Sequence, residues 1–209
     1  MSEIVTPGNQ LGWLKKKLDS AEMNHLWESI DNKKEYHKDK LAGIITGSWK
    51  LEDKNDWFWN NTLVPLCGEY ADKFENLGAD IPTSKRHPYY MHSWWVNYQK
   101  QNEFNPLHTH GGTYSFVIWM KIPTDYKEQQ QLPKSVGATS DAISNFVFTY
   151  TDLLGNIQTY TYFMSPKLEG TLLFFPAKLA HQVYPFYNCR DTRISISGNI
   201  QVDSSRTLL

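Results

Sequence analysis

The amino-acid sequence predicts a mainly β fold, a β-sandwich or barrel with helices gathered at its N-terminal end. The first observation is a series of short strand-like segments between residues 89 and 202, each bounded by turn residues. The second is an aromatic content of 14 %, concentrated in these segments, because aromatic residues favour pleated, half-buried surfaces. The third is that the residues before 89 follow a helical period instead.

The N-terminal part of the chain is expected to support the β region with helices. Residues 11–30 and 56–74 carry apolar side chains at a spacing close to 3.6 residues, which predicts two amphipathic helices. Pro65 is expected to kink the second of them. Between the helices, residues 43–49 have the pattern of a short strand. We expect a single domain over residues 1–209, with helical support at 1–86 and a β core at 87–209.

The β core is predicted from strands at 89–99, 113–122, 144–151, 157–164, 171–175, 181–186 and 193–202. Residues 152–156 should form a hairpin loop, because Gly155 and Asn156 tolerate positive φ. Residues 124–141 are polar, rich in Gln and without periodicity, so we expect an exposed loop that acts as a mobile lid. Within that loop, residues 128–131 are expected to be too polar to bury.

Composition and charge argue against several function classes. The formal net charge of −1 provides no global basic field that would favour nucleic acid or an anionic membrane. No apolar run approaches the roughly 20 residues needed to span a bilayer, and the N-terminus lacks a signal-peptide pattern. The two cysteines, Cys67 and Cys189, stand in no CxxC motif and do not form a disulfide framework. We therefore expect a cytoplasmic protein.

The most informative motif is a pair of histidines, His108 and His110, followed far downstream by His181 after an apolar strand. On a strand, residues two apart project from the same face. Gly111 and Gly112 let the backbone turn close to a ligand. A lone histidine is usually a surface or structural residue, but three imidazoles can together hold a divalent metal ion. The order and spacing of these histidines predict a metal site.

A polar face is predicted on the last strand, where Arg193, Ser195 and Ser197 alternate with isoleucines. This face either meets water or lines a cavity of the β core. A buried guanidinium needs an anionic partner. A bidentate pair with a ligand carboxylate would supply one, and Ser195 could add a hydrogen bond. Arg193 is therefore a candidate for holding a small acid beside the metal.

These motifs together resemble the Fe(II)/2-oxoglutarate-dependent dioxygenase superfamily. Val96-Asn97-Tyr98, then Phe104, Pro106, His108 and His110, is similar to the strand and first metal ligands of the prolyl-hydroxylase-like branch and of the HxH-type oxygenases of bacteria and phages. Gly170, Phe175-Pro176 and His181 resemble the strand and turn that carry the distal histidine. Arg193-x-Ser195 resembles the pair that grips the far carboxylate of 2-oxoglutarate. The resemblance covers roughly residues 89 to 202.

The resemblance implies a double-stranded β-helix, or jelly-roll, barrel flanked by N-terminal helices. It implies that Fe(II) binds His108, His110 and His181. It also implies 2-oxoglutarate as co-substrate, held by Arg193 with help from Ser195 and Tyr98. The implied reaction is oxidative decarboxylation of 2-oxoglutarate coupled to hydroxylation of a second substrate, which the sequence does not identify.

One departure from the family pattern leaves alternatives open. The usual iron triad is two histidines and a carboxylate, and His110 stands where the carboxylate is expected. A three-histidine iron site, a site that recruits Glu103 or another carboxylate, and a protein without turnover are all compatible with the sequence.

Two further alternatives dispense with 2-oxoglutarate: a cupin-like metal enzyme and a non-catalytic jelly-roll binding module. Cupins typically place a glutamate a few residues after the HxH, where this chain has Thr113, Tyr114 and Ser115. A simple binding module has no need of an inward arginine near the metal. Arg193 therefore separates these alternatives from the oxygenase.

Overall fold

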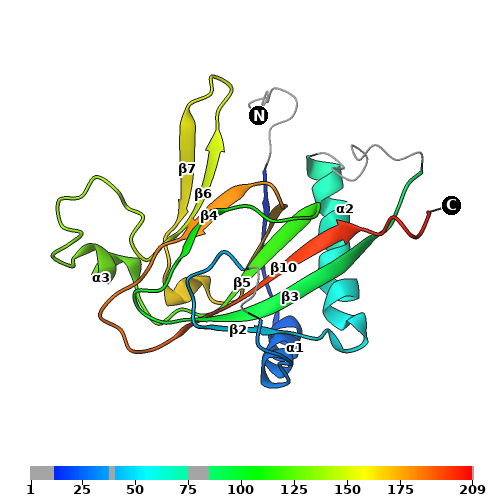
Figure 1. Ribbon diagram of the computed structural model, residues 1–209, viewed down its shortest axis with the longest axis horizontal. Helices are drawn as coiled ribbons and strands as arrows, with labels where there is room; N and C mark the ends of the chain where they lie inside the picture. Colours follow the sequence, from blue (N-terminus) through cyan, green and yellow to red (C-terminus); the bar gives the residue numbers. More distant parts are fainter. Residues whose placement is uncertain (1–11, 38–40, 75–84, 209) are drawn as a thin grey trace.

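The computed structural model describes residues 12–37, 41–74 and 85–208, and two antiparallel sheets form its core (Figure 1). The larger sheet has six strands in the order β1-β8-β5-β10-β3-β2, and the smaller has four in the order β4-β9-β6-β7. The predicted mainly β, jelly-roll fold is therefore confirmed. Within the described residues, however, the two sheets do not close into a barrel.

The strands of the larger sheet are β1 (Leu14–Lys17), β2 (Gly47–Lys50), β3 (Tyr89–Gln99), β5 (Tyr114–Lys121), β8 (Thr171–Pro176) and β10 (Arg193–Val202). Those of the smaller sheet are β4 (Asn105–His108), β6 (Phe146–Thr151), β7 (Ile157–Tyr162) and β9 (Ala180–Val183). The helices are α1 (Ser20–Asp31), α2 (Val64–Lys73) and α3 (Tyr126–Gln130). The strands predicted at 89–99 and 193–202 agree with the structure at both ends.

The larger sheet is buried on both faces, because alternate residues of its strands pack against different layers. One face packs on the helices, where Val96 and Ile196 share a core with Leu26 of α1 and Tyr70 of α2. The opposite face packs on the smaller sheet, in a second core that includes Phe146, Phe148, Leu173 and Phe175. The helices therefore cover the outside of the β core, as predicted. The two sheets pack together over part of their facing surfaces and enclose a cavity beside this second core.

The N-terminal segment departs from the prediction, because residues 11–30 do not form one helix. Leu14–Lys17 pair with β8 at the edge of the larger sheet. The helix begins only after Asp19, whose carboxylate accepts from the backbone N–H of Glu22 (2.8 Å) while Glu22 accepts from that of Asp19 (2.9 Å). This capping box fixes the start of α1. The prediction was wrong here because pairing with β8 outweighs the helical period of the local sequence.

The helix predicted at 56–74 is confirmed in its second half and is irregular in its first. A π-helical turn at Trp59–Leu63 leads into α2, and Pro65 lies in the first turn of α2. Proline is tolerated at the start of a helix, because the first N–H groups have no partner within the helix. None of the helices formed by the described residues is long and apolar enough to cross a membrane. Cys67 and Cys189 are both free.

The segment 124–141 is more ordered than a featureless loop. Asp125 caps the short helix α3 by accepting from the backbone N–H of Lys127 (2.9 Å). Gln129 is buried, and both ends of its amide are hydrogen-bonded there: Nε2 donates to the carbonyl oxygen of Tyr187 (2.9 Å), and Oε1 accepts from the backbone N–H of Tyr187 (2.8 Å). The expectation that residues 128–131 are too polar to bury is therefore wrong for Gln129. A lid role for this segment stays a prediction.

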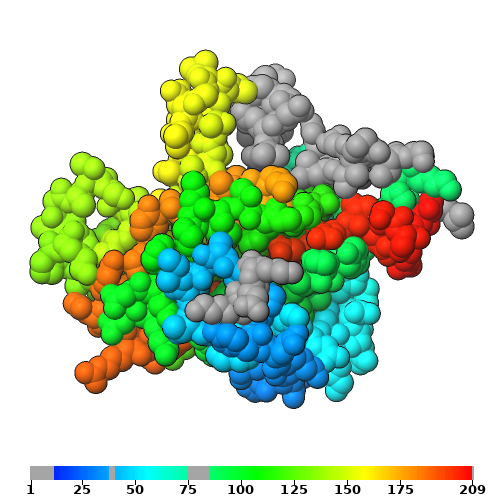
Figure 2. All heavy atoms as spheres, viewed as in Figure 1, coloured from blue at the N-terminus to red at the C-terminus, as the bar shows by residue number. Residues whose placement is uncertain are grey.

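The hairpin predicted around residues 152–156 joins β6 to β7 and projects from the body of the molecule (Figure 2). The Asp152 carboxylate accepts from the backbone N–H groups of Leu154 and Asn156, both at 2.9 Å. Gly155 adopts a φ of 82°, which a residue with a side chain rarely takes. The positive φ that the sequence predicted for this turn is thus confirmed at Gly155.

Candidate metal and anion site

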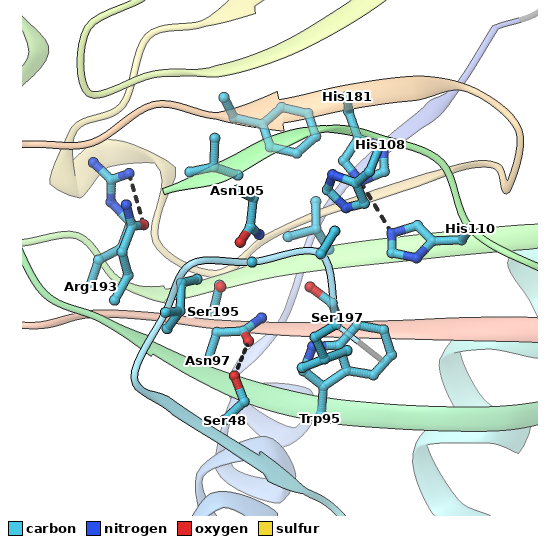
Figure 3. Close-up of a pocket in the computed structure, with 18 of the residues that line it drawn as sticks. Ser48, Trp95, Asn97, Asn105, His108, His110, His181, Arg193, Ser195 and Ser197 are labelled. Atoms are coloured by element: carbon cyan, nitrogen blue, oxygen red, sulfur yellow. Dashed lines mark hydrogen bonds between the residues drawn. The ribbon is translucent and has the colours of Figure 1, made fainter. Parts of the chain in front are cut away.

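Three histidines meet at one end of a cavity between the two sheets (Figure 3). His108 ends β4, His110 follows it by two residues, and His181 lies on β9, where it is paired with His108 across the strands. Their candidate ligand atoms all lie within 4.8 Å of one another. The structure therefore brings together the three histidines that the sequence singled out, and these residues could hold a metal ion.

Backbone carbonyls orient two of the three rings. Nδ1 of His108 lies 2.7 Å from the carbonyl oxygen of Pro106, and Nδ1 of His181 lies 2.9 Å from that of Leu179. A carbonyl oxygen can only accept, so each Nδ1 carries the proton and donates it. The Nε2 lone pairs of both rings are consequently left for a metal, which is how protein imidazoles are commonly prepared for ligation.

The spacing of the ring nitrogens also fits a single ion. Nε2 of His110 lies 3.2 Å from Nε2 of His181. Two nitrogens bound to one first-row metal at about 2.1 Å each, at angles between octahedral and tetrahedral values, lie about 3.0 to 3.4 Å apart. The distance in the protein falls within this range.

The surroundings keep these imidazoles neutral, which is the form that binds metals. Burial, followed by the neighbouring imidazoles, lowers the pKa of His181 to about 3. The same causes, burial and then His108, lower the pKa of His110 to about 4. Burial also lowers the pKa of His108. At neutral pH all three rings are therefore uncharged, so a metal would not have to displace the extra proton of an imidazolium.

Among the described residues, no carboxylate joins the three histidines. Glu103, the acid that the sequence offered, is engaged elsewhere: its carboxylate accepts from the backbone N–H and the hydroxyl of Thr46 (3.1 and 2.7 Å) and from the backbone N–H of Lys100 (2.8 Å). The arrangement thus fits the three-histidine alternative better than one that recruits Glu103.

Arg193 lies at the other end of the same cavity and is 2 % exposed. Its Nη2 donates to the carbonyl (2.8 Å) and the hydroxyl (2.9 Å) of Ser144, and its Nη1 donates to Oε1 of Gln99 (3.4 Å). Its Nε is buried without a partner among the described residues.

No acidic residue in the described part of the chain forms an ion pair with Arg193. Burial lowers the pKa of its guanidinium to about 9, which still leaves it charged at neutral pH. A buried cation without an acidic neighbour is costly. The Arg193 guanidinium also lies over the Phe186 ring, with its Cζ 4.9 Å from the ring centroid, and a guanidinium at this position could pair with an anion in the cavity.

Ser144 holds the arginine through an uncommon backbone conformation. Its φ of 65° lies in the left-handed region, which costs about 1 kcal/mol or more for a residue with a Cβ atom. The residue is fully buried, and its N–H donates to the carbonyl of Pro185 (3.1 Å). Both of its oxygens accept from the same guanidinium nitrogen, so the strained turn fixes where the arginine's charge lies.

The register of β10 determines which polar side chains enter the cavity. β10 runs between β3 and β5 in the larger sheet, and its alternate residues face the cavity together with their partners on β3. These pairs are Arg193 with Gln99, Ser195 with Asn97 and Ser197 with Trp95, and all six side chains line the cavity. The polar face predicted on the last strand therefore lines a cavity and does not simply meet water.

Tyr98 is the one predicted site residue that the structure does not bring to this cavity. It lies on the opposite face of β3, where its ring packs edge-on against Trp49 at 5.1 Å. Its neighbours Asn97 and Gln99 occupy the cavity-facing positions. The strand alternation carried this signal, because Asn97 and Gln99 are polar residues two positions apart at the end of β3 and Tyr98 lies between them, on the opposite face.

The jelly-roll-like fold thus joins, in one cavity, a histidine cluster that could hold a metal ion and a buried arginine. The chain belongs to the family described as "Putative 2OG-Fe(II) oxygenase", whose model matches residues 93–199. That stretch contains His108, His110, His181 and Arg193. No curated protein matches the sequence at a significant level.

Solved structures with the same fold include several such oxygenases. A Pseudomonas putida prolyl-4-hydroxylase is similar with a TM-score of 0.54 at 12 % identity, over 93 % of this chain and 94 % of that one. A Trichoplax adhaerens prolyl hydroxylase, in complex with a hypoxia inducible factor peptide fragment, has a TM-score of 0.56 at 10 % identity, over 94 % and 86 %. Identities this low show a shared fold, not a shared substrate.

Proposed function

We propose that this protein is an Fe(II)- and 2-oxoglutarate-dependent oxygenase that couples oxidative decarboxylation of 2-oxoglutarate to hydroxylation of a second substrate. The observation that carries the proposal is that one cavity joins a three-histidine cluster to a buried arginine that forms no ion pair within the described residues. A dicarboxylic acid with a chelating end would satisfy both ends of that cavity.

Each end of the cavity has a distinct task in this proposal. His108, His110 and His181 hold the iron through their Nε2 atoms, and bound iron supplies the oxygen chemistry. Arg193 pairs with the distal carboxylate of 2-oxoglutarate, for which its free Nε is available. The Ser195 hydroxyl, which lines the cavity beside it, adds a hydrogen bond. Ser144 and Gln99 keep the guanidinium in place.

Electrostatics favours a doubly charged acid as the ligand. Three neutral imidazoles leave the full charge of a divalent ion in place, whereas the usual carboxylate ligand would cancel part of it. Arg193 contributes a further positive charge in a setting where water cannot screen it. A dianion that reaches both ends offsets most of this charge, so the three-histidine site should hold 2-oxoglutarate firmly.

The proposal is tested by two anaerobic titrations. In the first, Fe(II) is added to the wild-type protein and to His181→Ala; the variant should lose stoichiometric binding without unfolding. In the second, 2-oxoglutarate is added to the Fe(II) protein, and the visible metal-to-ligand charge-transfer band is followed. Arg193→Leu should weaken 2-oxoglutarate roughly 30-fold to several thousandfold, and Arg193→Lys should recover only part of this, because an ammonium lacks the fork geometry.

The matched control is Arg190→Leu, which removes an exposed arginine close to β10 and should leave both titrations unchanged. If Fe(II) binds but 2-oxoglutarate does not, or binds Arg193→Leu as well as the wild type, a cupin-like metal enzyme replaces the proposal. If neither binds, the non-catalytic module does. Formation of succinate from 2-oxoglutarate in air provides the test of turnover.

A further inference from the structure

Asn105 presents its side-chain amide inside the same cavity, and the oxygen of that amide is unpaired among the described residues. It is the first residue of β4, and Figure 3 shows its side chain pointing into the space between Arg193 and the three histidines. Its Oδ1 is buried and has no hydrogen-bond partner among the described residues. A buried polar atom without a partner lowers the stability of the folded protein by about 1–3 kcal/mol. An asparagine at this position therefore indicates a role other than packing in the core.

The other two amides that line the cavity are already engaged. Oδ1 of Asn97 accepts from the hydroxyl of Ser48 (2.7 Å). Gln99 accepts from Arg193 (3.4 Å) and donates to the carbonyl of Glu103 (2.6 Å). Gln99 therefore has a partner at both ends of its amide and Asn97 has one at its oxygen, whereas Asn105 is the one of the three whose amide oxygen has no partner among the described residues.

Gly43 makes room for this amide and determines how it faces. A Cβ atom at position 43 would lie 2.2 Å from Oδ1 of Asn105, well inside van der Waals contact. The backbone at this point is fixed, because the N–H of Ile44 donates to the carbonyl of Phe104 (2.8 Å). With Oδ1 covered by Gly43, the amide nitrogen is the end left for the cavity.

We infer that Asn105 is a binding residue for the acid held between the histidines and Arg193, and that its Nδ2–H donates to an oxygen atom of that acid. The inference rests on the proposed function. Arg193 pairs with the distal carboxylate and the metal with the chelating end of the ligand. Asn105 lies between these two groups (Figure 3), and because the carbon chain of 2-oxoglutarate carries no oxygen there, its donor reaches an oxygen of one of the two ends. A site with such a buried donor discriminates against acids that lack the matching acceptor.

The test is titration of 2-oxoglutarate into the anaerobic Fe(II) forms of Asn105→Ala, Asn105→Asp and the wild type, with the charge-transfer band as readout. Loss of a hydrogen bond to a charged ligand should weaken 2-oxoglutarate about tenfold or more in Asn105→Ala. Asn105→Asp should weaken it further, because an acceptor and a negative charge replace the donor. Asn102→Asp, the same change at a more exposed turn position three residues earlier, is the matched control.

A double variant separates the role of Gly43. Gly43→Ala should weaken 2-oxoglutarate in the wild-type background, because the new methyl group displaces the amide, but should have little further effect in Asn105→Ala. Fe(II) affinity is measured for each variant and should stay close to that of the wild type in Asn105→Ala.

The outcomes distinguish this inference from the proposed function. If 2-oxoglutarate fails to bind the wild type, or binds Arg193→Leu equally well, the proposed function itself fails. If 2-oxoglutarate binds through Arg193 but titrates Asn105→Ala and Asn105→Asp as it titrates the wild type, Asn105 does not contact the acid and this inference alone is overturned.

Discussion

Replacing Arg193 by methionine should make the ligand-free protein more stable while it removes the proposed anion site. The guanidinium is 2 % exposed and has no acidic partner among the described residues. Methionine has a similar length, carries no charge and adapts to irregular space. Buried charges replaced by apolar side chains of similar volume often yield a more stable protein.

The magnitude follows from the environment of the arginine. A pKa lowered from 12.5 to about 9 by burial corresponds to about 5 kcal/mol of unfavourable free energy for the charged form. The substitution also removes the hydrogen bonds to Ser144 and Gln99, which are worth about 2 to 4 kcal/mol together. It removes the cation–π contact with Phe186 as well, which is worth about 1 kcal/mol. The expected net effect is a stabilisation of about 0 to 2 kcal/mol.

Urea unfolding of the metal-free protein measures this difference, read from the midpoint at constant m-value. Arg190→Met, at an exposed position, should change stability by less than about 0.5 kcal/mol. Saturation with Fe(II) and 2-oxoglutarate at about 100 times the dissociation constant should stabilise the wild type by about 2.7 kcal/mol more than the metal alone does, and Arg193→Met much less. A variant less stable than the ligand-free wild type would refute the reasoning.

Three other outcomes follow from the structure. In the folded protein the pKa values of His181 and His110 are lowered to about 3 and about 4, so the unfolded chain takes up more protons than the folded one as the pH falls through about 6.5. The free energy of unfolding of the metal-free protein should therefore fall by about 1 to 3 kcal/mol from pH 7.5 to 5.5. Urea unfolding measures this loss, which should be smaller in His181→Asn than in the wild type. Ser144→Gly, which relieves a φ of 65°, should be more stable in urea than Ser144→Ala by about 1 kcal/mol, and equal stabilities would contradict the strain. Gly198→Ala would place a methyl group 2.4 Å from the Phe116 ring, so thermal unfolding should show a loss of about 1–3 kcal/mol.

Much of the fold was predictable because the signals were local and repeated. The alternation in β10 and the aromatic run of β3 defined both strands at their ends, and the Gly155 turn identified the hairpin. The region before β3 was harder to read. β1 was predicted as helix because its apolar spacing suits either element, and only its pairing with β8 decides.

The site was predictable where the residue type itself limits the possible roles. The histidines and Arg193 could be selected from the sequence because metal ligands and inward arginines have distinctive neighbours. Ser144 and Asn105 could not: their roles arise from a left-handed backbone and from contact with Gly43, which no local pattern encodes. Tyr98 was placed on the correct strand but on the wrong face, because the pairing of β3 with β10 determines which alternate residues of β3 face the cavity.

The position of β10 in the middle of the larger sheet has a consequence for how the chain folds. β3 and β5 are made early, yet each pairs with β10 and not with the other. Until residues 193–202 leave the ribosome, both strands have one edge whose backbone N–H and C=O groups are unpaired, and such an edge can pair with other chains. Pairing of strands that lie far apart in the sequence is slow. β10 also carries Arg193, so the nascent protein acquires the buried arginine of its cavity in the same step in which β3 and β5 are joined.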